Sequence, residues 1–533
     1  MMGVGVVALL AATFACPMER VSSLQPCDAQ SAYDSYAVQL IYETPLAIDY
    51  AARPYRLKAG YCELPKVSED GLVYRLKIRR ESPLATRQEC RVPGAGANNG
   101  GEALLPRHSQ NVVTALRKLY EPTCPNGWIV KDVASITAPD DETVEIRLKR
   151  KLRYFPWLLA MSSCAVVAPD GKGTGPYVLK TWRKNHKMEF VRRHGDTAGE
   201  THRGTGASSV PRCVLARGVS KPTFDTVRYL VIDDLSTQWL MFLKGEVDYL
   251  KEVARDNWES VVGADGRLNP ELAAMGIRLH TKPSLETMYC GINMKDPVLG
   301  PNRKLRQALN AAFDFPAWER FNLYRVVEST GPVPPGIADR LETPFQYRFD
   351  LEKAKRLVAE AGYPDGIDPQ TGRRLVLTLA IGRADQASRE AGELMAAFYE
   401  KVGIKLEMDF MTWDAFLKAV NESRVQLYRM AWVADYPDAQ NFLQLFYGPN
   451  KSPGVNHSNY ENPEYDAAYE RDDYIACQEI LREDCPWVFT HYGKTCSLTG
   501  PKVGNFIPSD FPYGNEQYYT PVPSLSSATG AGK

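Results

Sequence analysis

The sequence has neither an excess of one charge nor a long apolar run. Lys and Arg together number 64, and so do Asp and Glu, which leaves the 533 residues with no net charge. Nucleic acid binds basic surfaces, so this balance argues against a nucleic-acid partner. A membrane-spanning helix needs about 20 consecutive apolar residues, and no stretch of the sequence reaches that length. The chain is therefore predicted to be a soluble globular protein that is long enough for several domains.

The motifs of common catalytic and metal sites are also missing. There is no H-E-x-x-H pattern for zinc and no G-x-S-x-G turn for a serine nucleophile, and the seven histidines are dispersed. The sequence therefore predicts no enzymatic activity, no metal site and no cofactor. A secreted hydrolase stays open as an alternative, and a converging nucleophile and base would be its signature.

The 11 cysteines are scattered along the chain and include no C-x-x-C pair, so a metal site built from thiolates is not expected. In an oxidising compartment, Cys477 with Cys485 or Cys90 with Cys124 are candidate disulfides. A disulfide needs two Cα atoms within about 7 Å of each other, and the sequence does not give that distance. Both pairings therefore stay open.

The first 16 residues are predicted to be a signal sequence. The apolar run from Val6 to Ala12 has the length of a secretory h-region, and Cys16 stands shortly after it, where a lipidated cysteine would be. Two features differ from a typical lipoprotein signal, because no Lys or Arg precedes the run and Phe14 is bulky. Export is the expectation, while lipidation of Cys16, a start further upstream and a cytosolic product stay open.

Hydrophobic periodicity separates the two halves of the chain. Apolar residues alternate over 72–78 and 144–148, as they do in half-buried strands. The stretches 90–108 and 195–218, of which the first is rich in Gly and Asn, are predicted to be loops. After residue 300 the period becomes helical, and Asp350 is predicted to cap a helix over 351–361. Strands then alternate with helices, which indicates an α/β fold; the predicted strands are 375–381, 404–410 and 425–432, and the predicted helices are 389–402 and 413–420.

Four groups of residues, in this order along the chain, resemble one protein family. The first comprises Ile41, Tyr42, Glu43, Leu46, Val67, Ser68, Asp70, Gly71, Leu72, Tyr74 and Leu76, and the second Gly173, Thr174, Gly175, Pro176, Tyr177 and Trp182. The third comprises Asn293, Arg303, Arg306, Gln307, Ala308, Asp314, Ala354, Leu357 and 361–366, and the fourth Trp432, 435–438, 441–443, Asn456, Tyr460, Asn462, Pro463 and Asp466. Together these residues resemble the bacterial extracellular solute-binding proteins of family 5, the dipeptide, oligopeptide and nickel binding proteins that serve ABC importers.

The resemblance implies a two-lobed α/β fold of the periplasmic-binding-protein type (type II, cluster C), with a subdomain inserted in the first lobe. We expect lobe I in residues 28–52, 161–284 and 490–519, the inserted subdomain in 53–160, and lobe II in 285–489. Residues 520–533 are expected to form a disordered tail, since they are rich in Pro, Ser and Gly. Hinges are expected near Lys282 and near His491.

The resemblance also implies a function, that of the extracytoplasmic substrate-binding component of an ABC importer. Such a protein captures small peptides between its lobes and delivers them to the permease in the membrane, without catalysis of its own. The chain is expected to be periplasmic or attached to the cell envelope, and to act as a monomer. A nickel chelate or a saccharide are alternative ligands within the same fold.

The candidate ligand-binding residues come from the same motifs. They are Tyr42, Gly173, Thr174, Gly175, Tyr289, Asn293, Trp432, Asp435 and Tyr436. Trp432 ends a predicted strand, and α/β sheets bind ligands beyond the carboxyl ends of their strands. The resemblance assigns Asp435 to the α-ammonium group of a peptide, whereas the plainer alternative is a cap of the helix that begins near Asp438. The G-T-G-P turn offers backbone amides and a hydroxyl to a ligand, or is an ordinary tight turn.

The two-lobed expectation predicts that the protein becomes more compact when it binds its ligand, because lobes of this kind close around it. Small-angle scattering, recorded with and without a saturating mixture of short peptides, should show a smaller radius of gyration in the presence of peptide. An unchanged scattering profile, under conditions where calorimetry proves binding, would count against this mechanism.

Overall fold

The computed structural model describes residues 12–29, 31–79, 107–168, 171, 173–193, 224–263, 266–508 and 515–522. The chain divides into two compact units. Unit 1 comprises Met1–Ala52, Arg56–His280 and Cys496–Lys533, and unit 2 comprises Arg53–Tyr55 and Thr281–Thr495. The chain therefore passes into unit 2 within one long strand, β12 (Arg278–Ile292), and returns within another, β17 (Trp487–Thr499).

Unit 1 contains a four-stranded sheet in the order β1-β10-β9-β8. Strand β1 (Thr13–Met18) runs parallel to β10 (Thr226–Val231), whereas β9 (Lys187–Arg192) pairs antiparallel with both β10 and β8 (Tyr177–Arg183). Helix α1 (Ala32–Ile41) begins at a capping box, in which Ser31 and Asp34 satisfy each other's backbone amides. Phe14, Val38 and Phe190 are among the fully buried residues of the core that joins this helix to the sheet.

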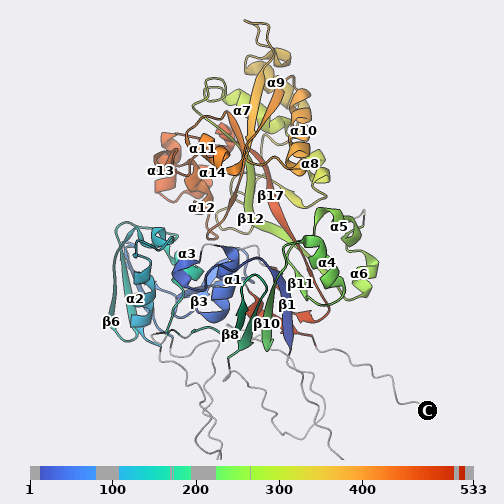
Figure 1. Cartoon of the computed structure of the whole chain (residues 1–533). Helices are drawn as coiled ribbons and strands as arrows, with labels where there is room; N and C mark the ends of the chain where they lie inside the picture. Colours follow the sequence, from blue (N-terminus) through green and yellow to red (C-terminus); the bar gives the residue numbers. More distant parts are fainter. Residues whose placement is uncertain are drawn as a thin grey trace, which may run out of the picture. The chain divides into compact units, whose positions relative to one another are not determined.

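A second four-stranded sheet of unit 1 has the order β4-β5-β7-β6, and Figure 1 shows its edge strand β6 beside helix α2. Its strands are β4 (Lys66–Val67), β5 (Val73–Lys77), β7 (Thr143–Leu148) and β6 (Val133–Asp140), and α2 (Ser109–Lys118) packs on β6 and β7. Strands β5 and β7 confirm the two strands predicted from the alternation over 72–78 and 144–148, and alternate residues of β7 are buried. The sheet lies within 53–160, the range expected for an inserted subdomain.

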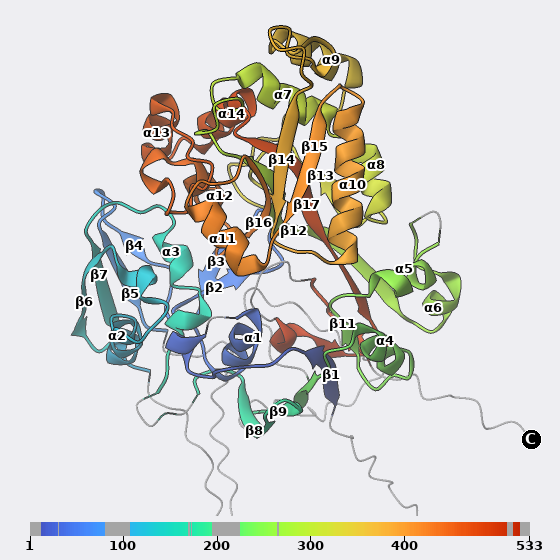
Figure 2. The ribbon, with the colours of Figure 1, turned by 45° about the horizontal axis from the view of Figure 1, so that its top comes forward.

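Unit 2 is built on the long strands β12 and β17, which are neighbours in a sheet with the order β11-β17-β12-β16-β14-β15. Strand β16 (Leu427–Val433) is antiparallel to β12 and parallel to β14 (Val376–Ile381), which is parallel to β15 (Lys405–Phe410). The short β13 (Val326–Glu328) pairs with β17, and β11 (Tyr249–Leu250) pairs with the end of β17 in unit 1. Helix α10 (Gln386–Glu400) packs on β15, and α7 (Arg303–Ala312) packs on α9 (Leu351–Glu360) (Figure 2).

Further helices and strands complete the two units. In unit 1 they are β2 (Leu46–Asp49), β3 (Arg56–Ala59), α3 (Phe155–Leu158), α4 (Leu235–Leu243), α5 (Arg255–Val261), α6 (Pro270–Ala274), β18 (Val503–Gly504) and β19 (Thr520–Pro521). In unit 2 they are α8 (Phe315–Phe321), α11 (Trp413–Asn421), α12 (Gln440–Leu443), α13 (Pro463–Glu470) and α14 (Tyr474–Asp484). None of the helices that the structure describes is both long enough and apolar enough to cross a membrane.

The α/β pattern predicted for the second half of the chain is confirmed. Asp350 caps α9 as expected, because its side chain accepts a hydrogen bond from the backbone N–H of Lys353. The helix predicted over 389–402 begins earlier, at Gln386, because Asp385 caps it through the N–H of Ser388. Most of the predicted loop 90–108, and all of the predicted loop 195–218, lie outside the described residues.

The structure describes only the end of the predicted signal sequence, because residues 1–11 lie outside the described part of the chain. Residues 13–16 belong to β1, and Cys16 is 1% exposed within the core of unit 1. The signal sequence over residues 1–16 and the lipidation of Cys16 stay predictions. At the other end, Thr520–Pro521 pair with β18, while 523–533 lie outside the described residues.

Candidate ligand-binding site

The turn that follows β16 brings together two of the predicted site residues. Trp432 is near the end of β16, and Asp435 follows two residues after the strand. Asn441, which is completely buried in α12, joins them. Its Oδ1 accepts hydrogen bonds from Nε1 of Trp432 at 2.9 Å and from the backbone N–H of Asp435 at 3.2 Å, and its Nδ2 donates to Oδ2 of Asp435 at 3.2 Å. A single amide thereby positions both the indole ring and the carboxylate.

The environment of Asp435 affects its ionisation. Burial raises the pKa of Asp435 above its ordinary value, and the hydrogen bond from Asn441 opposes this shift only in part. Burial disfavours the charged carboxylate, and a cation placed beside it favours the charged form again. This carboxylate is therefore suited to a positively charged ligand group.

Arg429 is a second charged residue on β16 and was not predicted. Its guanidinium lies 5.5 Å from the centre of the Trp318 ring, and burial lowers its pKa. Within the described part of the chain, the Arg429 side chain forms no hydrogen bond or ion pair. The sequence did carry a signal, since a charged residue stands in the middle of the apolar run 425–432, and buried charges are rare unless paired.

Tyr436 belongs to the same turn, but its side chain is buried. It is 3% exposed, and its hydroxyl donates to Oε1 of Gln440 at 2.5 Å. Nε2 of Gln440 in turn donates to the Tyr469 hydroxyl at 2.5 Å. The Tyr436 ring therefore belongs to an internal hydrogen-bond network of unit 2.

The structure does not bring Tyr289 and Asn293 to this turn. Tyr289 is buried and stacks on Trp487 with 3.3 Å between ring centres. Trp432 pairs with Thr287 and Leu427 pairs with Ile292, so the two ends of this strand pair are about 17 Å apart at 3.3–3.4 Å per residue. Asn293 follows Ile292 at the far end, where its amide donates to the carbonyl oxygens of Ser423 and Val425.

In unit 1 the G-T-G-P turn meets the end of α1. The Thr174 hydroxyl accepts a hydrogen bond from the backbone N–H of Glu43 at 2.9 Å and donates to the Val166 carbonyl at 2.8 Å. The backbone N–H of Gly175 donates to the Ile41 carbonyl at 2.7 Å. Tyr42, which caps α1, is 9% exposed. The turn and Tyr42 thus lie together, and the bonds of the turn hold the chain after α1 in place.

Glycine is required in this turn because the backbone of α1 is so close. A Cβ atom on Gly173 would lie 2.3 Å from the Ile41 carbonyl oxygen, and one on Gly175 would lie 2.7 Å from the Ile41 carbonyl carbon. Both distances are far below a normal contact, so a side chain at either position would force the turn away from α1.

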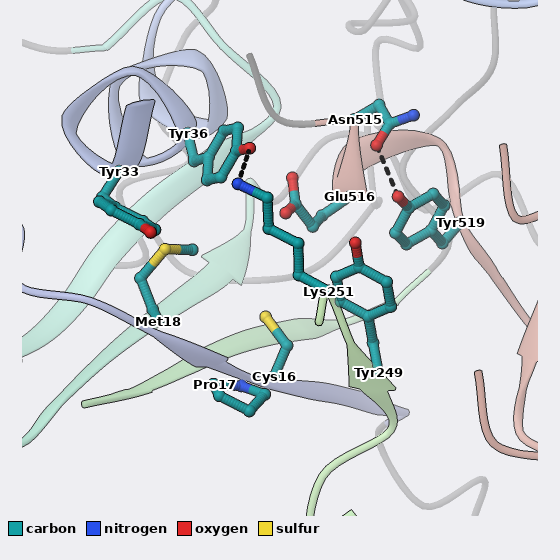
Figure 3. Close-up of a pocket in the computed structure, with 10 residues that line it drawn as sticks. All are labelled: Cys16, Pro17, Met18, Tyr33, Tyr36, Tyr249, Lys251, Asn515, Glu516 and Tyr519. Carbon is teal, nitrogen blue, oxygen red and sulfur yellow. Dashed lines mark hydrogen bonds between the residues drawn. The ribbon is translucent and has the colours of Figure 1, made fainter. Parts of the chain in front are cut away.

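Unit 1 also contains a small cavity (Figure 3) of about 30 Å³. It is lined by Cys16, Pro17, Met18, Tyr33, Tyr36, Tyr249, Lys251, Asn515, Glu516 and Tyr519. The Lys251 side chain extends to the Tyr36 hydroxyl, to which Nζ donates at 3.2 Å, and the Glu516 carboxylate lies beside it (Figure 3). A buried water needs roughly 10–15 Å³, so the cavity has room for water and not for a peptide.

The cavity contains a carboxyl group that titrates near neutral pH. Glu516 is 6% exposed, and burial raises its pKa to about 7, although Lys251 and the Tyr229 hydroxyl favour the ionised form. Its Oε2 is buried without a hydrogen-bond partner among the described residues. Elsewhere in the described chain, no three His, Cys, Asp or Glu side chains gather in a way that could hold a metal ion.

The glycine contact predicts that Gly173→Ala destabilises unit 1, because the added methyl group meets backbone that cannot move freely. We expect a loss of roughly 2–4 kcal/mol in the free energy of unfolding, measured by urea denaturation. Gly171→Ala is the control in the same turn. Gly171 has φ of +78° but nothing within 4 Å of the added atom, so we expect only about 1 kcal/mol. Equal losses for both variants would contradict the packing argument.

The buried carboxyl group predicts a stability that falls as the pH rises. The folded state keeps a proton on Glu516 up to about pH 7, whereas the unfolded chain releases it near 4.5, so the stabilisation is complete below 4.5 and is lost as the pH rises through 7. Each unit of pKa corresponds to about 1.4 kcal/mol, so the loss from this group is on the order of 3 kcal/mol. The free energy of unfolding, measured by denaturation from pH 5 to 8, should decline less steeply for Glu516→Gln than for the wild type. Glu252→Gln is the control, because Glu252 is an exposed neighbour of Lys251, and it should match the wild type.

The chain is similar to known proteins over most of its length. It is 23% identical over 503 residues to heme-binding protein A of Haemophilus influenzae, which covers 87% of this chain and 83% of that protein. It is 26% identical over 501 residues to the glutathione-binding protein GsiB of Escherichia coli O1:K1 / APEC, which covers 88% and 86%.

A solved structure shows the same fold. The ABC transporter-associated periplasmic binding protein DppA of Helicobacter pylori, in complex with the peptide STSA, superposes with a TM-score of 0.65 at 19% identity, covering 96% of this chain and 98% of that one. The predicted fold class is thereby confirmed. Residues 101–454 match the family described as Bacterial extracellular solute-binding proteins, family 5 Middle, which also confirms the predicted class of importer component. The chain belongs to the family 5 bacterial extracellular solute-binding proteins.

Proposed function

We propose that this protein captures short peptides outside the cytoplasm and delivers them to the permease of an ABC importer. The observation that carries the proposal is the Asp435 carboxylate, which Asn441 holds beside Trp432 at the carboxyl end of β16. Ligands of α/β sheets bind beyond the carboxyl ends of the strands, and this carboxylate stands at such a position. Family membership supports a soluble ligand outside the cytoplasm.

The chemistry of a peptide N-terminus matches Asp435. A free α-amine has a pKa near ~8 and is largely cationic at neutral pH. A charge-assisted hydrogen bond to a desolvated carboxylate recognises this group whatever side chains follow it. An ammonium ion beside Asp435 also favours the ionised carboxylate, whose pKa burial has raised. The related GsiB is named for glutathione, which is itself a tripeptide.

Trp432 provides the second contact of the proposed site. Asn441 holds its indole ring beside the Asp435 carboxylate, so the ring offers an apolar surface to a peptide whose N-terminus lies at that carboxylate. Arg429 is not part of the proposed site, because side chains alternate along β16 and the Arg429 side chain points to the opposite face of the sheet from Trp432.

The delivery step requires the membrane partner that the family serves, and we propose that the chain acts as a monomer until it meets that permease. The proposed location is the periplasm or the outer face of the cell envelope. A lipid anchor at Cys16 is not part of the proposal, because that residue lies in the core strand β1.

The peptide proposal predicts that Asp435→Asn weakens the binding of a short peptide by at least ~30-fold, since removing one partner of a buried charge pair costs on the order of 2–5 kcal/mol. Calorimetry with free and N-acetylated forms of one tripeptide measures the effect. The wild type should distinguish the two forms, and Asp435→Asn should not. Affinity for the free peptide should also fall as the pH drops through the raised pKa of Asp435, because protonation removes the charge that the ammonium group needs.

Asp350→Asn is the matched control, since Asp350 caps α9 in the same unit. It should leave peptide affinity unchanged. If the wild type binds free and acetylated peptides equally, Asp435 only orders the turn and the ligand is another solute, for which heme is the next candidate to titrate.

A further inference from the structure

Three cysteines from distant parts of the sequence meet in unit 1. Cys27 is the middle residue of a short 3-10 helix (Pro26–Asp28) that precedes α1. Cys124 lies in the turn after α2, and Cys164 ends another 3-10 helix (Ser162–Cys164), which packs on the first. The thiols are close enough that an ionised Cys124 would raise the pKa of both Cys27 and Cys164.

Hydrogen bonds join the turn that contains Cys124 to the chain around Cys27. Sγ of Cys124 donates to the backbone carbonyl oxygen of Cys27 at 3.2 Å. Two residues later, the side-chain amide of Asn126 donates to the same oxygen at 2.9 Å and to the Ala29 carbonyl at 3.0 Å. These bonds hold the Cys124 thiol against the Cys27 backbone, while the Cys27 thiol donates to Oδ1 of Asp28 at 3.5 Å. Both thiols must leave these hydrogen bonds before the two sulfurs can bond.

Accessibility selects one pair among the three thiols. Cys27 and Cys124 are each partly exposed, whereas Cys164 is completely buried and its thiol donates to the Leu158 carbonyl at 3.2 Å. An oxidant arriving from solvent therefore reaches Cys27 and Cys124.

The structure argues against one of the two pairings suggested by the sequence and does not test the other. Cys477 and Cys485 are eight residues apart along α14 and its end, which separates them by about 12 Å at 1.5 Å per residue, well beyond the reach of a disulfide. Their thiols donate to different carbonyls, those of Tyr465 and Arg482. The alternative partner of Cys124, Cys90, lies outside the described residues.

We propose that Cys27 and Cys124 form a disulfide when the protein reaches an oxidising compartment. The proposal rests on the extracytoplasmic location given under Proposed function, because disulfides persist where no reducing system removes them. The bond would join the segment between β1 and α1 to the segment that follows α2. It would therefore link the two four-stranded sheets of unit 1 through their helices.

The reaction is a thiol–disulfide exchange with a disulfide-bearing oxidant, either a small disulfide or an oxidoreductase. The Cys124 thiolate attacks one sulfur of that disulfide, which forms a mixed disulfide and releases the first thiol. Cys27 then loses its proton to solvent and attacks the Cys124 sulfur, which releases the second thiol. Two electrons and two protons pass to the oxidant. Burial and the neighbouring Asp28 carboxylate raise the pKa of Cys27 to about 11, so the attack begins at Cys124.

The experiment uses the full chain, purified under reducing conditions and equilibrated with 2-hydroxyethyl disulfide and 2-mercaptoethanol. Glutathione is avoided because it is a possible ligand. After free thiols are alkylated, non-reducing peptide mapping should show the Cys27 and Cys124 peptides linked, with a mass lower by two hydrogen atoms. The bond closes a loop of about 100 residues, so oxidation should raise the melting temperature by roughly 5 °C.

Cys27→Ser and Cys124→Ser should each abolish the linked peptide and the oxidation-dependent rise in melting temperature, whereas Cys477→Ser should keep both. Absence of a linked peptide under the most oxidising buffer, or a link from Cys124 to Cys164 or Cys90, overturns the proposal. Peptide calorimetry on the reduced protein tests the ligand separately. Cell fractionation tests the location separately, because the exchange in vitro does not depend on where the protein is made.

Discussion

Buried amide side chains hold the loops of unit 2, and the candidate site depends on one of them. Asn441 bonds both the ring of Trp432 and the carboxylate of Asp435. Asn293 and Asn310 have the same role elsewhere, since each bonds backbone groups of segments distant in sequence. A side-chain amide offers two donors and an acceptor, and leaving a buried polar group unpaired costs roughly 1–3 kcal/mol. These loops therefore keep one conformation even where apolar packing is sparse.

Desolvation acts on two carboxyl groups with different consequences. Asp435 and Glu516 both have a raised pKa because burial disfavours their charge. Asp435 stands at the end of a strand, where an incoming cation can restore its charge. Glu516 faces a cavity with room for water only, beside Lys251 and several tyrosine hydroxyls, so it acts on the stability of unit 1. The same physical effect thus marks a candidate binding group in one place and an internal titrating group in the other.

Several family motifs in this chain have a structural role. Gly173 and Thr174 pack against the end of α1, and the Thr174 hydroxyl uses both of its bonds on backbone. Asn293 bonds the chain beyond β12, and Tyr289 stacks in the core. Of the predicted site residues, Trp432 and Asp435 remain at a strand end with chemistry suited to a peptide. A short motif shows that particular residues recur in a family. Only the contacts around those residues in the structure show whether they serve packing or ligand binding.

The sequence by itself determined the local features. Alternation predicted β5 and β7, and the Asp350 cap predicted α9, because these signals depend on neighbours along the chain. The order of the motifs was sufficient to identify the family. Tertiary structure alone decided that Cys16 lies in a core strand, that the half-buried Arg429 side chain lies over the Trp318 ring, and that the Cys124 thiol contacts the Cys27 backbone. Each of these depends on residues tens to hundreds of positions apart, and a distance through space cannot be read from spacing along a chain.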